Sequence, residues 1–152
     1  MAMAISKSLY LEDLRVGQAF ESLSKKIELE DMLGFAQAFD PQSFHLDPAA
    51  ARSSIFGSLA ASGWHTAALT MSLLVSSVPL AKGIIGLDIQ LNWPYPTYPD
   101  DFLQVKAVVQ DIEVSSTKLD RGVVTMEIET CNQDGKVVQH AIAKLLVFKK
   151  QP

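Results

Sequence analysis

The sequence predicts an α+β fold in which one antiparallel sheet wraps around a buried helix. Apolar residues recur at helical spacing in the first half of the chain, whereas from Ile84 onward they alternate with polar residues, as in half-buried strands. The segment from Gly63 to Ser76 is apolar almost all round and carries no charged side chain, which is typical of a helix enclosed by other structure. Helical segments followed by a run of long strands indicate the α+β class.

The first half of the chain is expected to hold one strand and several helices. The strand covers residues 18–27, and a helix runs from Glu30 to Phe39 with acidic residues at its N-terminal end, where the helix dipole favours them. Asp40 precedes a proline, so the helical backbone conformation is disfavoured there and the helix ends. A brief helix with Pro48 in its first turn follows, and the long helix over residues 63–76 comes next.

The second half of the chain contains the strands. Leu87 and Ile89 alternate with polar neighbours, and residues 92–101 form a proline-rich bend. The Asp134-Gly135 pair is typical of a tight turn between two antiparallel strands. The expected strands cover residues 84–91, 102–112, 123–131 and 137–148.

Length and composition limit the possible classes of protein. At 152 residues with 48% hydrophobic composition, the chain fits one domain, over residues 1–152, with a substantial core. The formal net charge of −4 argues against a nucleic-acid partner. The single Cys131 cannot form an internal disulfide, and residues 1–10 lack the pattern of a secretory signal, so we expect a cytoplasmic protein.

The uncharged stretch between Arg52 and Lys82 is long enough to suggest a membrane span. Serine, threonine, glycine and histidine interrupt it repeatedly, however. A buried helix with its preceding loop explains the same composition, so we expect no association with a membrane.

One loop and one turn carry residue types suited to chemistry. Asp40 and His45 lie five positions apart in a proline-broken loop, where they can act as a positioned pair for proton transfer. Gly63, downstream at the start of the long helix, can supply a backbone N–H to a developing oxyanion. Together these residues suggest an enzyme that moves water onto or off an activated carbon–carbon double bond.

Three separated motifs of this chain resemble the MaoC-like dehydratases, the family that includes the R-specific enoyl-CoA hydratases. The loop Asp40-Pro41-Gln42-Ser43-Phe44-His45-Leu46-Asp47 resembles the family's Asp-x-Asn-Pro-x-His-x-Asp, and the segment Ala60-Ala61-Ser62-Gly63-Trp64-His65 falls where the family has its oxyanion glycine. Residues 92–101 resemble the family's Trp-x-x-Pro…Pro-Gly-Asp. The chain departs from the family pattern at four positions, where it carries Phe39, Gln42, Ser43 and Asp100.

The resemblance implies a hot-dog fold and a set of roles for the matching residues. Asp40 and His45 would hold one water between them, with either residue as the base, and the N–H of Gly63 would bind the thioester oxygen. Ser62 and Gln42 would complete the substrate site. The implied partner is an acyl-CoA or an acyl-carrier-protein-linked substrate, converted to an R-hydroxyacyl product.

The sequence favours neither a redox cofactor nor a metal. It has no glycine-rich phosphate loop, and its three histidines and Cys131 form no short-spaced ligand pair. Lys118 and Arg121 are candidate contacts for the phosphates of CoA.

Several of these residues also have purely structural interpretations. Asp40 alone suits an Asx turn, and Asp47 and Ser62 are good N-cap residues for the helices that follow them. His65 and His140 are more simply structural than catalytic. Aromatic side chains are expected in the core, or in part along an acyl tunnel; these are Phe35, Phe39, Phe44, Phe56 and Trp64.

Two rival functions remain open. A hot-dog thioesterase would commonly carry a carboxylate on the central helix; residues 63–76 contain none, although a partner subunit could supply one. A non-catalytic subunit that binds acyl chains or completes an oligomer is the other alternative, for which the altered Gln42-Ser43-Phe44 motif leaves room. In every case we expect a homodimer or a dimer of dimers, because a lone sheet of this kind leaves an exposed edge.

Overall fold

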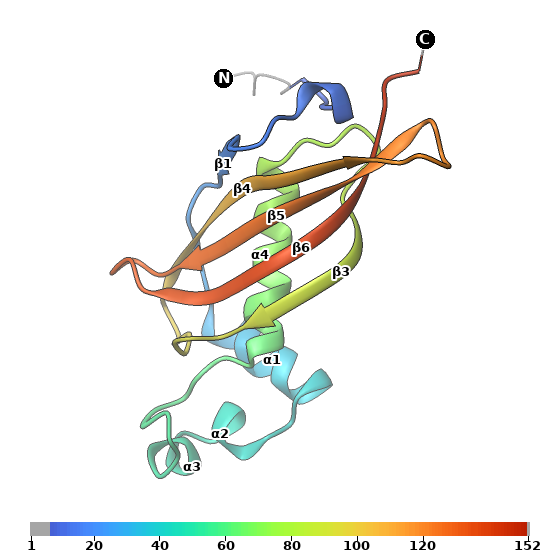
Figure 1. The fold of residues 1–152 in the computed structure, drawn as a ribbon. Coiled ribbons are helices and arrows are strands. Elements are labelled where there is room, and N and C mark those ends of the chain that lie inside the picture. Colours follow the sequence, from blue (N-terminus) through green and yellow to red (C-terminus); the bar gives the residue numbers. More distant parts are fainter. Residues whose placement is uncertain (1–6, 152) are drawn as a thin grey trace.

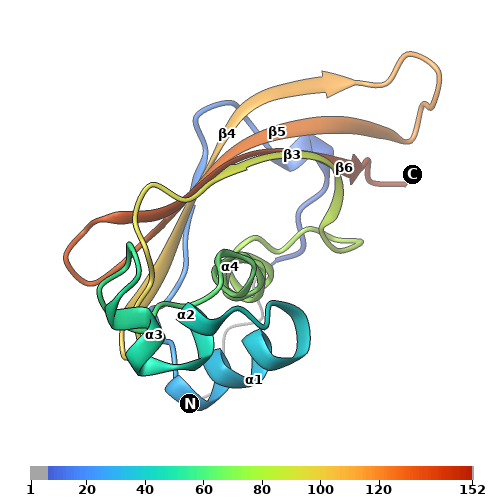
Figure 2. The ribbon, with the colours of Figure 1, turned by 90° about the horizontal axis from the view of Figure 1, so that it is seen from below.

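The computed structural model describes residues 7–151 and shows an antiparallel sheet curled around a long helix (Figures 1 and 2). A short 3-10 turn, Leu11–Asp13, comes first. The strands are β1 (Ala19–Glu21), β2 (Lys25–Lys26), β3 (Ile85–Asn92), β4 (Phe102–Val114), β5 (Arg121–Cys131) and β6 (Val137–Phe148). The helices are α1 (Leu29–Phe39), α2 (Ser43–Leu46), α3 (Pro48–Arg52) and α4 (Gly63–Ser77).

The strands form one sheet in the order β1-β4-β5-β6-β3, with β2 pairing separately to β4, and every pairing is antiparallel. β4, β5 and β6 follow one another as long hairpins. β3 precedes them in the chain but lies at the far edge of the sheet, beside β6. The helix α4 crosses the concave face of the sheet; Figure 2 shows this helix viewed along its axis.

The core lies between α4 and the concave face of the sheet. Alternate residues of β5 point inward, as the sequence predicted, and Val124, Met126 and Ile128 are almost fully buried there. Leu73 and Leu74 of α4 pack against them. Each such buried side chain contributes about 1.5–3 kcal/mol relative to full exposure, so this layer fixes the position of α4 on the sheet.

The helical segments α1, α2 and α3 lie together at one end of the molecule, around the N-terminal end of α4 (Figures 1 and 2). The predicted first strand over residues 18–27 is only partly right, because residues 22–24 separate β1 from β2. The sequence did not predict the one-turn helix α2. The brief helix with Pro48 in its first turn is confirmed as α3.

The strand β3 differs from the prediction of a half-buried strand. Seven of its eight residues are exposed, and the side chains of Leu87 and Ile89 are 55% and 58% exposed. Its register shifts between Gly86 and Asp88, and among residues 7–151 no further strand pairs with its outer edge. The alternation of apolar and polar residues therefore predicted the strand correctly but not its burial.

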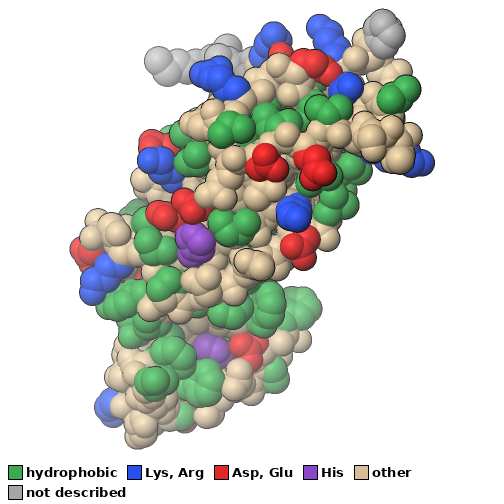
Figure 3. Space-filling model, in the orientation of Figure 1, with side chains coloured by type: hydrophobic (Ala, Val, Ile, Leu, Met, Phe, Trp, Pro, Cys, Tyr) green, Lys and Arg blue, Asp and Glu red, His purple; other side chains and the backbone are tan. Residues whose placement is uncertain are grey.

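Two of the aromatic residues expected in the core or along an acyl tunnel are largely exposed, although Trp64 also lines the hollow described below. Phe39 is 74% exposed and Trp64 is 60% exposed, whereas Phe35, Phe44 and Phe56 are partly buried. In Figure 3, hydrophobic side chains gather on the visible face over the end where α2 and α3 lie. A histidine and an acidic side chain are visible among them. Charged side chains are concentrated over the rest of that face.

Within residues 7–151, no helix combines the length and apolar character needed to cross a membrane. The first six residues of the segment tested for a secretory signal lie outside the described part of the chain.

Candidate active site

Asp40 and His45 face each other across the short loop between α1 and α2. Asp40 ends α1 as its C-cap residue, and α2 is a single turn that carries His45 back toward it. The Asp40 Oδ2 and His45 Nε2 atoms lie 3.2 Å apart. The proline after Asp40 ends the helix, as the sequence predicted, and thereby allows the chain to reverse.

The backbone fixes which nitrogen of His45 carries a proton. His45 Nδ1 lies 2.7 Å from the carbonyl oxygen of Ala60. Because a carbonyl oxygen can only accept, Nδ1 must carry a hydrogen and donate it. Nε2 is then the nitrogen that faces Asp40, and a direct hydrogen bond to the carboxylate requires a second proton there. The pair therefore shares one mobile proton between Nε2 and Oδ2.

Three side chains donate to, or face, the carboxylate of Asp40. Gln42 Nε2 donates to Oδ1 at 2.6 Å, and Ser62 Oγ donates to Oδ2 at 2.7 Å. Partial burial raises the pKa of Asp40, but the hydrogen bonds from Gln42 and Ser62 and the charge of His45 outweigh it, so the pKa lies below its usual value. Asp40 is thus held in the ionised form required of a base.

Ser62 has one of the two roles that the sequence left open to it, the N-cap of α4, and it also makes a contact with Asp40 that the sequence did not predict. It is the N-cap of α4, where its Oγ accepts from the backbone N–H of Trp64 at 3.3 Å, and the same hydroxyl donates to Asp40. The Ser62 hydroxyl therefore contacts Asp40 and is not free to bind substrate. Asp47 caps α3 through a 3.0 Å bond from the Ala49 N–H, which agrees with its structural interpretation.

Gly63 is the first residue of α4, so its backbone N–H lies in the turn where helical N–H groups have no partner within the helix. The ring of Trp93 packs directly over it. A Cβ built on Gly63 would lie 2.7–3.0 Å from three atoms of that ring. Close packing of the indole, rather than an unusual backbone conformation, therefore requires glycine here.

These residues line one hollow of about 380 Å³. Asp40, Gln42, His45 and Gly63 form one side of it. The rest of the wall comes from aromatic and small residues, namely Phe56, Ala61, Trp64, Thr66, Trp93, Tyr95, Pro96, Thr97 and Val138. The hollow is large enough for a small acyl group beside the Asp40–His45 pair.

The sequence missed three features of this site. The Ala60 carbonyl is a backbone group and leaves no signal in residue type. Trp93 belongs to a recognised motif, but its position over Gly63 depends on the tertiary structure. Gln139, which accepts from Trp93 Nε1 at 2.9 Å, lies 46 positions away from it in the chain.

Two candidate phosphate contacts lie elsewhere. Lys118 and Arg121 are at the β4–β5 hairpin, at the opposite end of the sheet from α2 and α3 (Figure 1). Arg121 pairs with Asp120 at 2.8 Å. Within one copy of the chain, neither residue reaches the hollow beside Asp40.

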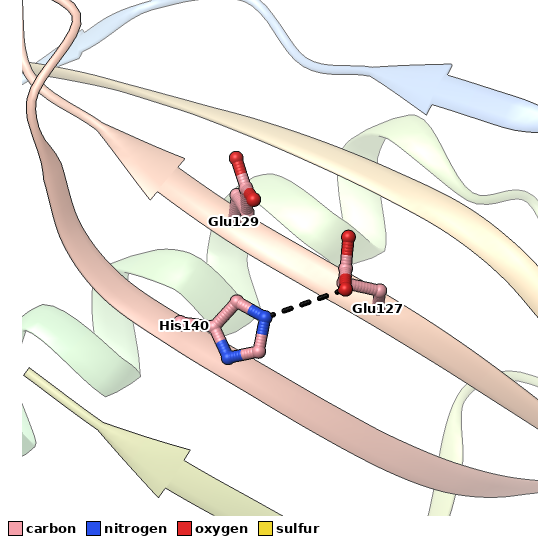
Figure 4. A group of neighbouring side chains, drawn as sticks. All are labelled: Glu127, Glu129 and His140. Carbon is pink, nitrogen blue, oxygen red and sulfur yellow. Dashed lines mark ion pairs between the residues drawn. The ribbon is translucent and has the colours of Figure 1, made fainter.

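The remaining two histidines are also apart from the Asp40–His45 pair. His65 is buried and stacks on Phe35 with ring centroids 4.9 Å apart. His140 lies on β6, where its Nε2 is 3.4 Å from Glu127 Oε2, with Glu129 beside it (Figure 4). The ligand-type atoms of these three residues lie within 4.8 Å of one another; a cross-strand ion pair explains this arrangement without a bound ion.

Comparison with known proteins places the chain in a family. The family model of the MaoC like domain matches residues 13–131. An (R)-specific enoyl-CoA hydratase from Aeromonas caviae is 30% identical over 139 residues, which cover 88% of this chain and 97% of that protein. The chain belongs to the MaoC-like domain family.

Solved structures agree on the fold. A MaoC-like dehydratase from Rhodospirillum rubrum is 52% identical and superposes with a TM-score of 0.93, over 95% of this chain and all of the other. The unliganded R-hydratase from Pseudomonas aeruginosa is 26% identical with a TM-score of 0.74, over 94% of this chain and 88% of the other. The predicted α+β hot-dog fold is confirmed.

Proposed function

We propose that this protein is a hydro-lyase that adds water to, or removes it from, an enoyl thioester, with the R-3-hydroxyacyl thioester as the hydrated form. The observation that carries the proposal is the 3.2 Å contact of Asp40 Oδ2 and His45 Nε2 in a hollow that Gly63 also lines. Base, acid and oxyanion donor are the three groups that hydration of a conjugated thioester requires.

The proposed hydration moves two protons, one from water to Asp40 and one from His45 Nε2 to the substrate. A water bound between the pair gives a proton to the ionised Asp40 as its oxygen bonds to the β carbon. The thioester carbonyl becomes enolate-like, and the N–H of Gly63 binds its oxygen. Protonated His45 Nε2 then delivers its proton to the α carbon. Transfer of the proton from Asp40 to His45 restores the pair, and dehydration runs through the same steps in reverse.

The supporting residues keep the base ionised and the acid oriented. Gln42 and Ser62 donate to the two oxygens of Asp40, and the Ala60 carbonyl fixes the ring of His45. Because both proton-transfer groups lie on one side of the hollow, we expect syn addition. The substrate is an acyl-CoA or an acyl-carrier-protein-linked thioester. Since these residues supply every group the reaction needs, we expect no cofactor and no metal.

Exchange of either member of the pair tests the proposal. Asp40→Asn and His45→Ala should each lower kcat for the hydration of crotonyl-CoA by about 10²–10⁴-fold, measured as loss of the ultraviolet absorbance of the conjugated enoyl group. Asp47→Asn is the matched control, because Asp47 belongs to the same loop but only caps α3. Full activity in both Asp40→Asn and His45→Ala, with folding intact, contradicts the mechanism.

Product analysis separates this function from its rivals. A thioesterase would release free CoA, which a thiol reagent detects, whereas a hydratase leaves the thioester intact. The absence of any acidic residue on α4 argues against the thioesterase. A non-catalytic acyl-binding subunit would bind crotonyl-CoA without turnover, and the paired Asp40 and His45 argue against it.

We also propose that two copies pair along β3 as a homodimer or as half of a dimer of dimers. The outer edge of β3 is unpaired within the described residues, and apolar side chains lie exposed on it and on the adjacent face of α4; these are Ile85, Leu87, Ile89, Met71 and Val75. Pairing would cover the strand edge and close the outer side of the groove between β3 and α4. A stable monomer in sedimentation at micromolar concentration would contradict this.

Cys131 favours a cytoplasmic location for the assembly.

A further inference from the structure

A second hollow lies along α4, next to the residues of α4 that line the candidate active site. It has a volume of about 520 Å³ and lies between α4 and the β3 edge of the sheet. Its wall is mainly apolar, with Met71 and Leu74 from α4, Leu87 and Ile89 from β3, and Ala141 from β6 among its residues. It is larger than the hollow beside Asp40 and would suit an aliphatic chain.

The two hollows are lined by residues that are neighbours in the chain. Thr66 lines the hollow of the Asp40–His45 pair and Ala67 lines the apolar one. Likewise, Val138 lines the first and Gln139 the second. The hydrogen bond from Trp93 Nε1 to Gln139 Oε1 spans this boundary, because Trp93 lines only the first hollow.

A β-bulge explains why two adjacent residues of β6 both point inward. Thr130 pairs with Gln139 but Cys131 pairs with Val137, so Val138 is an extra residue in β6. Both Val138 and Gln139 are almost fully buried, whereas alternation would place one of them on the outer face. Bulges commonly redirect side chains in this way beside functional sites. Here the bulge brings the amide of Gln139 to the indole.

Trp93 is held in place on more than one side. Its ring lies against Gly63, the ring of Trp64 meets it edge-on with centroids 5.2 Å apart, and Gln139 accepts from its N–H. An indole fixed by these contacts forms a wall rather than a mobile side chain.

We infer that Trp93, positioned by Gln139, determines acyl-chain length by closing the hollow of the Asp40–His45 pair toward the apolar hollow between α4 and β3. This inference rests on the proposed function. A short enoyl group fits in front of the indole, whereas a longer chain needs the space behind it. Each methylene buried in an apolar site improves binding about fourfold, so opening the wall should favour long chains strongly.

Trp93→Ala is the direct test. The ratio of kcat/KM for trans-2-octenoyl-CoA to that for crotonyl-CoA should rise by about 10–100-fold over the wild-type ratio, since octenoyl carries four more methylenes. Gln139→Leu should shift the ratio in the same direction but less, because the wall remains but loses its anchor. Gln139→Glu retains an acceptor for the indole N–H and should keep the wild-type ratio. A rise with Leu but not with Glu identifies Gln139 as a positioning residue.

Trp64→Ala is the comparison variant, because it removes the edge-on contact to Trp93 but leaves the indole of Trp93 and its bond to Gln139 in place. Its ratio should rise much less than that of Trp93→Ala, even if KM changes. An unchanged ratio in Trp93→Ala, or an equal rise in Trp64→Ala, overturns the inference. If Trp93→Ala does not fold, Trp93→Phe combined with Gln139→Leu takes its place and must show the rise.

Failure of the proposed function is distinguishable from failure of this inference. If the wild type hydrates no enoyl-CoA, the proposed function is wrong. Calorimetric binding of the saturated probes butyryl-CoA and octanoyl-CoA then decides the role of Trp93 separately. Trp93→Ala should improve octanoyl-CoA binding at least tenfold relative to butyryl-CoA, and an unchanged preference contradicts the role.

Discussion

Gly63→Ala should destabilise the protein, although the same exchange usually stabilises a helix. Alanine within a helix is favoured over glycine by about 0.5–1 kcal/mol. At this position, however, the new methyl group would lie 2.7–3.0 Å from three ring atoms of Trp93. Overpacking of this kind costs about 1–3 kcal/mol, so the steric effect is the larger one. We expect the free energy of unfolding to fall by about 1–2 kcal/mol.

The double variant Gly63→Ala/Trp93→Ala reverses that sign. Without the indole, the methyl group has room, and Gly63→Ala should be neutral or stabilising by up to about 1 kcal/mol. Denaturant unfolding of the four proteins measures this coupling. Equal effects of Gly63→Ala with and without the indole, or full stability of the single variant, would refute the reasoning.

The same exchange should also reduce activity. Relief of the contact moves either the indole or the first turn of α4, and a shift of about 1 Å in a binding group can cost roughly 10²-fold in rate. We expect kcat for crotonyl-CoA hydration to fall while the second exchange, Trp93→Ala, recovers part of it. Because Gly63→Ala keeps the backbone N–H, a normal kcat would show that relief of the contact does not displace this donor.

Three further predictions concern single residues. Ser62→Ala removes both the cap of α4 and one donor to Asp40. The free energy of unfolding should therefore fall by about 1 kcal/mol, and the acidic limb of the pH–rate profile should move to higher pH. Ser62→Thr should retain both the cap and the donor. Asp100 has a positive φ of 70°, so Asp100→Gly should be more stable to urea than Asp100→Ala by about 1 kcal/mol. Burial lowers the pKa of His65. Below pH about 6.5 the unfolded chain therefore binds a proton that the folded chain does not, and the free energy of unfolding falls with decreasing pH. His65→Leu should flatten this dependence between pH 6.5 and 5, and an unchanged slope would contradict it.

Local patterns predicted the elements that local interactions form. The helix α4 and the strand β6 match their expected ranges within one residue, because an uncharged run and a turn-bounded alternation are visible in the chain itself. The spacing of Asp40 and His45 is local too, and a single turn of α2 brings them together. The exposure of β3 was not predictable in this way, because strand order decides which strand lies at an edge.

Parts of the candidate site depend on contacts between distant segments. The position of Gln139 results from a register shift between β5 and β6, and no periodicity in either strand reports such a shift. Trp93 meets Gly63 only because the bend after β3 returns over the start of α4. The surface position of Phe39 and Trp64 follows from the same limit, since hydrophobicity does not tell a core residue from one beside an open hollow or an interface.

Helix polarity explains why the proposed reaction needs a proton on His45. Asp40 follows the C-terminal end of α1, which disfavours an anion, and its carboxylate bonds to Ser62 at the N-terminal end of α4, which favours one. The thioester oxygen would become negative at that same end of α4, beside the N–H of Gly63. In the proposed hydration, Asp40 accepts the proton of water as the charge appears on the thioester oxygen, so the negative charge moves without increasing. Protonated His45 then removes that charge by delivering its proton to the α carbon.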